Sequence, residues 1–372
     1  MKGENIYMKI IIGADIVPTK VSEQYYLENN VEYLFTDVLP LMRGADITVF
    51  NLECALTNSE NRIKKFGPHI KASPMCANAL KLAGVTDLAI SNNHVFDFGI
   101  EGLMETTNAL NNSGLNYMGI GKNDTESRKP YYVEKCGVKI AFINVCEHEY
   151  SYATEDRIGC NPFDPFLTMH DIREAKKNCD YVIVLYHGGK EHAYYPSPRL
   201  MRCCREMVDC GASVVLTQHS HCIGCYEEYD GGHILYGQGN FHFPHVNNVP
   251  EHWYTSLLTE LNVTKDKLDI KFYPVFMQGA QIFLAKDDKY EEIMRSFEKR
   301  NLQIKNGEWK KGWTDFCESI RKNYVYDYSQ NVNSIMPTPE EARHHTFSHF
   351  LDCEAHTDVL RELFVTWNAT NK

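Results

Sequence analysis

The sequence predicts an α/β protein followed by a mainly helical C-terminal part, and two observations lead to this fold class. Short apolar runs rich in β-branched residues alternate with helical patterns from about residue 8 to about residue 285, which is typical of α/β folds. From about Ala285 the sequence becomes charged and helical in pattern, and a His- and Glu-rich segment covers residues 337–363. We therefore predict a domain over residues 1–285 and a helical extension over residues 286–372 that packs on it.

Composition limits the class of protein. The chain has 372 residues, of which 43% are hydrophobic and 23% charged, as in ordinary globular proteins. Its formal net charge of −11 argues against a nucleic-acid or anionic-membrane binder. No stretch approaches the roughly 20 apolar residues of a membrane span, and residues 1–9 lack the apolar centre of a signal peptide. The 13 cysteines are odd in number and irregularly spaced, which favours reduced thiols. We expect a cytoplasmic protein.

The predicted elements follow one another with few long connections. Strands are expected over residues 9–13, 46–51, 88–90, 116–119, 181–186 and 214–217, and hairpins over residues 131–145, around 230–232 and over 256–276. Helices are expected over residues 34–41, 75–83, 100–110, 168–178, 197–210, 286–300, 312–323 and 337–363. Residues 146–166 are polar and aromatic and are expected to form a long loop, a kind of segment that often carries function.

Several predicted strands end in polar side chains that can bind metals. These side chains are Asp15, Glu53, Asn93 with His94, His187, and His219 with His221. Adjacent strands lie about 5 Å apart, and α/β sheets place their ligands at the carboxyl ends of strands. We therefore expect these side chains to converge. Two carboxylates, an amide and several imidazoles suit one or two divalent ions of the Zn, Mn or Fe kind.

The segment 91–99, Ser-Asn-Asn-His-Val-Phe-Asp-Phe-Gly, is the most informative of these strand ends. Adjacent polar residues at the end of a core strand are costly to bury unless they bind something. An amide oxygen can ligate a metal, and the imidazole of His94 can ligate a metal or move a proton. The alternative is an ordinary loop in which Asp97 caps the helix that follows.

The ordered set of motifs resembles the CapA family of capsule or poly-γ-glutamate synthesis proteins, whose fold is related to calcineurin-like metallophosphoesterases. The resemblance covers about residues 8–280. The motifs that carry it are Gly13-Ala14-Asp15, Asn51-Leu52-Glu53, Asn92-Asn93-His94 with Asp97-Phe98-Gly99, His187-Gly188-Gly189-Lys190-Glu191, His219-Ser220-His221 and Gly239-Asn240-Phe241. It implies a four-layer α/β/β/α sandwich of two mixed sheets, with the metal site at the strand ends.

The resemblance also implies roles for individual residues. It assigns metal ligation to Asp15, Glu53, Asn93, His187, His219 and His221. It makes His94 the acid or phosphate-orienting group, with Asp97 as its partner, and it leaves Asn92, Glu191 and Asn240 to support the ligands or bind substrate. Val17 stands where the phosphoesterases' opening motif carries a histidine, so one of two metals would have one ligand fewer.

The function expected from this resemblance is a metal-dependent, phosphoesterase-like hydrolase linked to capsule or poly-γ-glutamate metabolism, with a phosphoester or an anionic polymer as substrate. Two alternatives stay open: a non-hydrolytic polymer-binding or assembly component, and an amide-bond hydrolase or transferase acting on poly-γ-glutamate. The sequence has no Gly-x-x-x-x-Gly-Lys-Ser/Thr loop, no dinucleotide-binding glycine motif after a strand and no Gly-x-Ser-x-Gly elbow.

Two further clusters have competing interpretations. Cys222 and Cys225 are a lone Cys-x-x-Cys pair, either a redox or zinc motif or two small strand residues. In the C-terminal part, side chains at helical spacing could share one face, namely His345, His349, Asp352 and His356. They indicate either a second metal site or the polar side of an amphipathic helix packed on the main domain.

Overall fold

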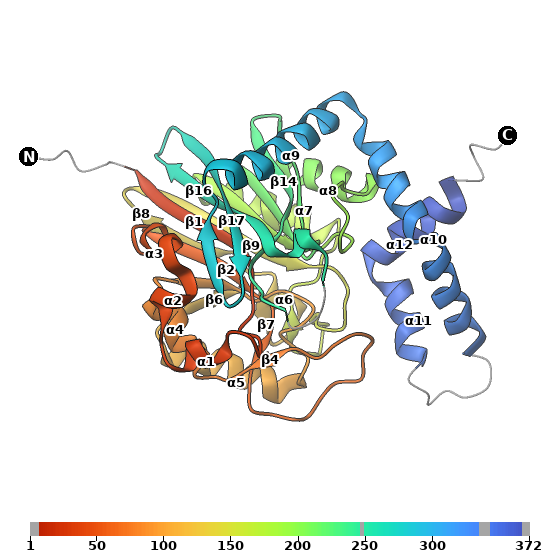
Figure 1. The fold of residues 1–372 in the computed structure, drawn as a ribbon, viewed down its shortest axis with the longest axis horizontal. Coiled ribbons are helices and arrows are strands. Elements are labelled where there is room, and N and C mark those ends of the chain that lie inside the picture. Colours follow the sequence, from red (N-terminus) through yellow and green to blue (C-terminus); the bar gives the residue numbers. More distant parts are fainter. Residues whose placement is uncertain (1–6, 246–248, 335–342, 367–372) are drawn as a thin grey trace, which may run out of the picture.

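The computed structural model describes residues 7–245, 249–334 and 343–366, and it describes side chains over 7–245, 249–329 and 348–365. The chain forms two mixed β-sheets that lie against each other, with helices on the outer sides and a further group of helices at the C-terminal end (Figure 1). The predicted four-layer sandwich with a helical C-terminal part is confirmed.

The first sheet is built around the first strand of the chain. Its strand order is β18-β17-β16-β1-β2-β5-β6, and β15 also pairs with β1. Strand β1 is parallel to β2 and antiparallel to β16. Its strands are β1 (Met8–Ile16), β2 (Ile47–Leu52), β5 (Asp87–Ala89), β6 (Asn116–Met118), β15 (Asn240–His242), β16 (Thr255–Val263), β17 (Leu268–Gln278) and β18 (Gln281–Leu284).

The second sheet has the order β13-β14-β12-β11-β9-β8, with parallel pairing at its centre. Its strands are β8 (Tyr131–Lys135), β9 (Val138–Cys146), β11 (Tyr181–His187), β12 (Val214–Gln218), β13 (Ile223–Tyr229) and β14 (Gly232–Gln238). Two small ladders join connecting segments: β3 (Ala55–Leu56) pairs with β4 (Lys71–Ala72), and β7 (Ile120–Gly121) pairs with β10 (Gly159–Cys160).

The strict alternation of strand side chains explains the layers. In β1, Ile10 and Ile12 belong to the buried cluster that also contains Phe142 and Leu185 of the second sheet. Ile11, between them, belongs to the cluster on the opposite face, under the helices. Because successive side chains point to opposite faces of a strand, a continuous apolar run is what a strand covered on both faces requires.

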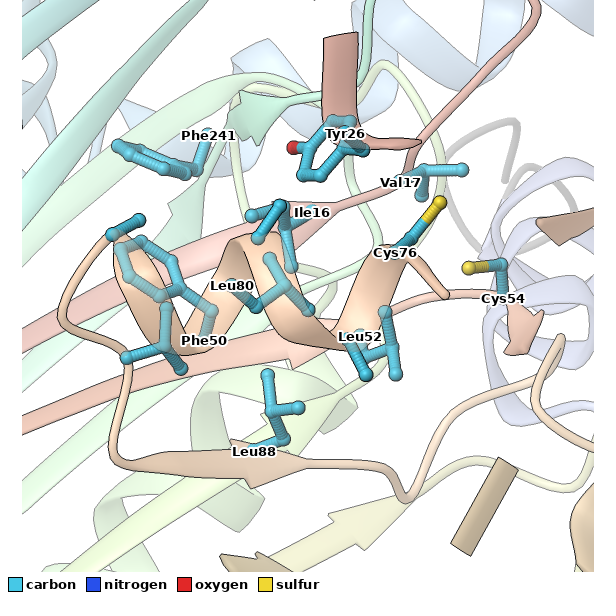
Figure 2. Close-up of a cluster of buried hydrophobic side chains, with 14 of the residues drawn as sticks. Ile16, Val17, Tyr26, Phe50, Leu52, Cys54, Cys76, Leu80, Leu88 and Phe241 are labelled. Atoms are coloured by element: carbon cyan, nitrogen blue, oxygen red, sulfur yellow. The ribbon is translucent and has the colours of Figure 1, made fainter. Parts of the chain in front are cut away.

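The outer face of the first sheet is covered by the N-terminal helices. Figure 2 shows this cluster, in which Leu80 and Cys76 of α4 lie near Ile16 and Leu52 of the sheet. The rings of Phe50 and Phe241 pack with their centroids 4.3 Å apart. The helical elements of this layer are α1 (Glu23–Leu27), α2 (Val31–Phe35), η1 (Thr36–Val38), α3 (Leu39–Arg43), α4 (Cys76–Leu82) and α5 (Gly99–Asn112).

The outer face of the second sheet is covered mainly by α7 (Leu167–Lys176) and α8 (Pro198–Asp209), while the short α6 (Asp124–Ser127) lies against β7 and β10. Helix α8 begins as the sequence suggests, because the Ser197 side chain accepts a hydrogen bond from the Leu200 N–H at 3.0 Å and Pro198 occupies the first turn. A short turn, η2 (Glu251–Tyr254), precedes β16.

Helix α9 (Asp287–Asn306) runs over the sandwich and packs against β13 and β17 (Figure 1). The helices after it gather on one side of the sandwich (Figure 1), and they are α10 (Trp309–Ser334), α11 (Arg343–Asp352), α12 (Glu354–Arg361) and the final turn η3 (Glu362–Thr366). The single helix predicted over 337–363 is wrong, because Cys353 separates α11 from α12, and residues 335–342 lie outside the described ranges. Contacts from Glu354 to His148 at 2.7 Å and from Asp358 to Arg199 at 2.9 Å join α12 to the main domain.

Two sequence-based expectations can be compared with the structure directly. All 13 cysteines lie within the described ranges, and all are unpaired. Among the helices in the described part of the chain, none combines the length and the hydropathy needed to cross a bilayer. The division at residues 285 and 286 stays a prediction.

Candidate metal centre

The strand-end side chains come together at one edge of the two sheets. Asp15 lies in β1, and Glu53 and Asn93 follow β2 and β5 of the same sheet. His187 ends β11, and His219 and His221 follow β12 of the second sheet. Each of these side chains is buried, and Asp15 and Glu53 have no exposed surface. The structure thus places the predicted ligands from both sheets in one buried group.

Glu53 lies at the centre of this group. Its Oε1 is 3.4 Å from Nε2 of His187, 3.9 Å from Nδ1 of His219 and 4.0 Å from Nε2 of His221. Ligand atoms of Glu53, His219 and His221 all lie within 4.8 Å of one another. A carboxylate beside three imidazoles is a donor set that suits divalent transition metals.

Asp15 is held in place by two amides. Asn51 donates from Nδ2 to Oδ1 of Asp15 at 2.7 Å, and Asn92 donates from Nδ2 to Oδ1 of Asn51 at 3.1 Å. The free oxygen of Asp15, Oδ2, lies 3.4 Å from Nδ1 of His221. The predicted supporting residue Asn92 therefore acts through Asn51, whose role the sequence did not indicate.

Asn93 presents its amide oxygen to the group. Its Oδ1 lies 3.0 Å from Nε2 of His187, and its Nδ2 donates to Oε2 of Glu149 at 2.9 Å. Because the amide nitrogen is engaged by Glu149, the oxygen is the atom left for a metal. Glu149 also reaches Nε2 of His219 at 3.3 Å. Glu149 lies in the predicted loop 146–166. It does not follow a predicted strand, so the sequence analysis did not identify it as a candidate ligand.

The two histidines after β12 adopt an unusual backbone conformation. His219 has φ +79° and His221 has φ +52°, in the left-handed region that residues with a Cβ enter rarely. Nδ1 of His221 lies 2.8 Å from Oδ1 of Asn240, and its ring packs on Trp253 with centroids 4.5 Å apart. Such strain persists where the surroundings fix it, and it is concentrated at functional sites. The contact with Asn240 can therefore orient the ring of His221.

The electrostatics of the group favour ionised carboxylates. Burial alone would raise the pKa of Glu53, but the imidazoles of His221, His187 and His219 hold it well below its ordinary value. Burial lowers the pKa of His221, yet Glu53 and Asp15 outweigh that effect and raise it to about 9. The carboxylates of Glu149 and Glu53 likewise outweigh burial and raise the pKa of His219. Without metal, the rings of His219 and His221 therefore hold protons that a divalent cation would displace.

Several atoms of this group have no hydrogen-bond partner although they are buried. They are Oδ2 of Asp15, both carboxylate oxygens of Glu53 and Nδ1 of His219. Leaving such atoms unpaired costs roughly 1–3 kcal/mol each, and most buried polar groups in proteins are paired. The unpaired atoms belong to residue types that bind transition metals, and ligand atoms of Glu53, His219 and His221 lie within 4.8 Å of one another. The residues therefore fit one or two divalent ions.

His94 lies beside the centre, and its ring is held by Asp97. Nδ1 of His94 lies 2.8 Å from Oδ2 of Asp97, and Asp97 also accepts from the Ile70 N–H at 2.7 Å. Lys65 contacts the other oxygen of Asp97 and lies 3.2 Å from Nδ1 of His94. Burial would raise the pKa of Asp97, but His94 and Lys65 lower it. The alternative that Asp97 caps the next helix is wrong, because the cap of α5 is Phe98 and no side chain bonds there.

The group opens into a cavity of about 330 Å³. The cavity is lined by Asn93, His94, His219 and His221 of the centre, and Tyr324, His349 and His356 of the C-terminal helices line another part of its wall. Glu191 also lines it and is paired with Lys190 at 3.6 Å.

The Cys-x-x-Cys pair lies outside this centre. Cys222 and Cys225 are buried, and their sulfur atoms lie 3.5 Å from the carbonyl oxygen of Ala193 and 3.3 Å from that of Tyr194. Their contacts are those of small strand residues. Val17, which stands where the related motif has a histidine, is buried in the outer apolar cluster.

Comparison with known proteins identifies the family to which the chain belongs. The family model described as "Bacterial capsule synthesis protein PGA_cap" matches residues 9–245. "Capsule biosynthesis protein CapA" of Bacillus anthracis is 28% identical over 249 residues, 64% of this chain and 61% of that protein. "PGA biosynthesis protein CapA" of Bacillus subtilis (strain 168) is 30% identical over 234 residues, 62% of this chain and 61% of that protein. The match spans about three fifths of both relatives.

Among solved structures, the 5'-nucleotidase from Candida albicans SC5314 aligns with 84% of this chain and 57% of its own, at 10% sequence identity and a TM-score of 0.43. A TM-score of this size is too low to assign a shared activity.

Fold and site together define an α/β/β/α sandwich protein with a carboxylate, amide and imidazole centre between the ends of its two sheets. The chain belongs to the bacterial capsule synthesis protein family PGA_cap, because the family model covers more than half of its 372 residues. The resemblance to CapA proteins is thereby confirmed.

Proposed function

We propose that the chain is a metal-dependent hydrolase that acts on a phosphoester or on an anionic polymer in capsule or poly-γ-glutamate metabolism. The proposal rests on one observation. Asp15, Glu53, Asn93 and the three histidines come together in a buried group, and several of their ligand atoms have no hydrogen-bond partner. Structural cations need closed coordination, whereas this group borders an open cavity that also contains His94.

In this proposal Asp15, Glu53, Asn93, His187, His219 and His221 hold one or two divalent ions such as Mn²⁺, Fe²⁺ or Zn²⁺. Bound there, such an ion would polarise a phosphoryl or acyl oxygen and lower the pKa of water. Asn51 and Asn92 orient Asp15, and Asn240 orients His221. These amide contacts fix ligand directions before the metal arrives.

His94 supplies the proton-transfer step. Its Nδ1 faces Asp97 at 2.8 Å, so Nε2 is the ring atom that remains to meet a substrate in the cavity. The carboxylate of Asp97 stabilises the protonated ring, and Lys65 keeps that carboxylate ionised. Nε2 would then donate a proton to the leaving oxygen or hold the group that is cleaved.

The test combines metal analysis with turnover. Protein purified without chelator should hold between one and two equivalents of a transition metal, and it should hydrolyse an aryl phosphate when Mn²⁺ is added, with EDTA abolishing the activity. A variant His221→Ala should lose metal and turnover together, while His170→Ala on the exposed surface of α7 serves as the control.

The absence of metal after purification, together with no change in melting temperature on adding Mn²⁺ or Zn²⁺, would overturn the metal assignment. Bound metal without turnover of phosphate or γ-glutamyl substrates would instead support the polymer-binding alternative. The cytoplasmic location stays a prediction.

A further inference from the structure

A second group of potential ligands lies across the cavity from the strand ends. It consists of His349 in α11, His356 in α12 and Glu149 in the loop after β9. One ligand atom from each lies within 4.8 Å of the other two. The three side chains are each less than a tenth exposed, so this is a buried group and not a surface cluster.

The two imidazoles are held rigidly. Their ring centroids are 4.2 Å apart, and His349 stacks on Tyr150 at 5.5 Å with an interplanar angle of 15°. Nδ1 of His356 contacts the hydroxyl of Tyr324, which leaves Nε2 of that ring for a ligand. Nδ1 of His349 is buried and has no hydrogen-bond partner. A buried, unpaired imidazole nitrogen in a group with a second imidazole and a carboxylate is a feature that a cation would explain.

The charges around the group suit a bound cation. The carboxylate of Glu149 lies next to the two imidazoles, and the nearby Lys190 is paired with Glu191 at 3.6 Å.

Glu149 connects this group with the strand-end centre. Its Oε1 lies 3.3 Å from Nε2 of His219, and its Oε2 accepts from Nδ2 of Asn93 at 2.9 Å. The thiol of Cys353 lies 3.2 Å from Oε1. One carboxylate therefore borders both groups of potential ligands.

We propose that Glu149, His349 and His356 form an additional site for a divalent transition metal of the zinc type, distinct from the site at the strand ends. Two imidazoles and a carboxylate are a common three-ligand zinc set, and they leave a fourth position for water or an anionic group of a substrate. The bound ion would tie α11 and α12 to the loop after β9 and so fix the wall of the cavity. The proposal does not depend on the hydrolase activity.

The metal-site alternative drawn from the sequence pattern contained a different set of residues. It grouped His345, His349, Asp352 and His356 on one helix. The side chain of His345 lies outside the described ranges, and Asp352 accepts a hydrogen bond from Tyr152 at 2.8 Å. The carboxylate that joins His349 and His356 comes instead from a loop some two hundred residues earlier.

The main experiment measures Zn²⁺ stoichiometry and affinity on the full-length chain, using His349→Gln with His356→Gln. The double variant should bind about one equivalent less than the parent, or bind that equivalent more than about tenfold more weakly, since even outer-shell changes cost that much. The strand-end metal should remain. The matched control is His192→Gln with His252→Gln. The ring nitrogens of these two histidines lie 2.9 Å apart, but among the described residues neither belongs to a group of three potential metal ligands.

A second measurement covers the case in which the double variant fails to fold. In a His187→Ala, His221→Ala background that removes the strand-end metal, Zn²⁺ should still slow proteolysis within α11 and α12 of the otherwise native chain. Stoichiometry and affinity equal to the parent's in the double variant overturn the additional site. So does an absence of Zn²⁺ protection in the strand-end variant. If only the strand-end assignment is wrong, the parent should still bind the one equivalent of Zn²⁺ that the His349→Gln, His356→Gln variant lacks.

Discussion

The ring of Phe50 occupies the space that any side chain at position 13 would need. A Cβ built on Gly13 would lie 1.9 Å from Cε1 of Phe50, far inside van der Waals contact. Phe50 cannot move away easily, because it is fully buried against Phe241. The glycine in the Gly13-Ala14-Asp15 motif therefore serves the packing beneath the site.

Gly13→Ala should consequently destabilise the protein by about 1–3 kcal/mol, the usual cost of overpacking a core. The midpoint of urea unfolding measures the change. Adding Phe50→Leu should recover part of the loss by removing ring atoms at the point of contact. An unchanged midpoint in the single variant would contradict the packing argument.

His94→Asn should separate proton transfer from metal binding. Asp97 keeps Lys65 and the Ile70 N–H as partners when the imidazole is removed, so metal content and melting temperature should change little. Turnover of a substrate with a poor leaving group should fall by about 10²–10⁴, the range for lost general acid–base help. An activated aryl ester should lose less, because its leaving group needs little protonation.

His219→Ala is the matched comparison for His94→Asn, since it should lower metal content itself. The assignment of His94 fails if its variant loses metal to the same extent, or if it hydrolyses both substrates at the parental rate.

Removal of metal should lower the melting temperature, because the unpaired oxygens of Glu53 and Asp15 would lose their partner. At a free metal concentration one hundred times the dissociation constant, the gain in stability is about 2.7 kcal/mol. Scanning calorimetry before and after EDTA treatment, and after restoring Mn²⁺ or Zn²⁺, measures it. Glu53→Gln should lose most of the metal-dependent gain, and a gain equal to the parent's would exclude Glu53 as a ligand.

Asp358→Ala should loosen the C-terminal helices. Oδ2 of Asp358 accepts from Oγ of Ser197 at 2.6 Å and from Nε of Arg199 at 2.9 Å. Arg199 keeps Glu147 as a partner at 2.6 Å, so the loss should be smaller than the roughly 3–5 kcal/mol that leaving a buried charge unpaired costs. We expect faster proteolysis in α12 and a lower melting temperature. Asp315→Ala breaks an exposed pair with Lys311 on α10 and should have almost no effect; equal effects of the two changes would rule out a special role for the buried pair.

The sequence predicted the elements whose signal is local. Strands such as β9 and β11 are rich in β-branched residues. The polar groups at the ends of β1, β2 and β11 identified Asp15, Glu53 and His187 as ligand candidates. Asn51 and Glu149 were not identified, because their roles come from pairing between strands and from a loop without periodicity. Lys65 was missed for the same reason, since its partner Asp97 lies 32 residues further along the chain.

The C-terminal helices show a second limit. An apolar pattern with i, i+3 and i+4 spacing fits one long helix as well as two short ones, and no glycine or proline marks the break at Cys353. Nor does any local pattern reveal that His349 and His356 face Glu149, because that contact is set by how α11 and α12 dock on the main domain.

The position of β1 in the first sheet determines the order in which the chain can fold as it is made. Met8 pairs with Val263 and Asp15 pairs with Asn240, so one edge of the first strand has no partner until more than two hundred further residues have left the ribosome. An apolar strand with an open edge is prone to pair with other chains, and distant pairings slow folding. The N-terminal half of this protein should therefore depend on chaperones during synthesis more than its size alone would require.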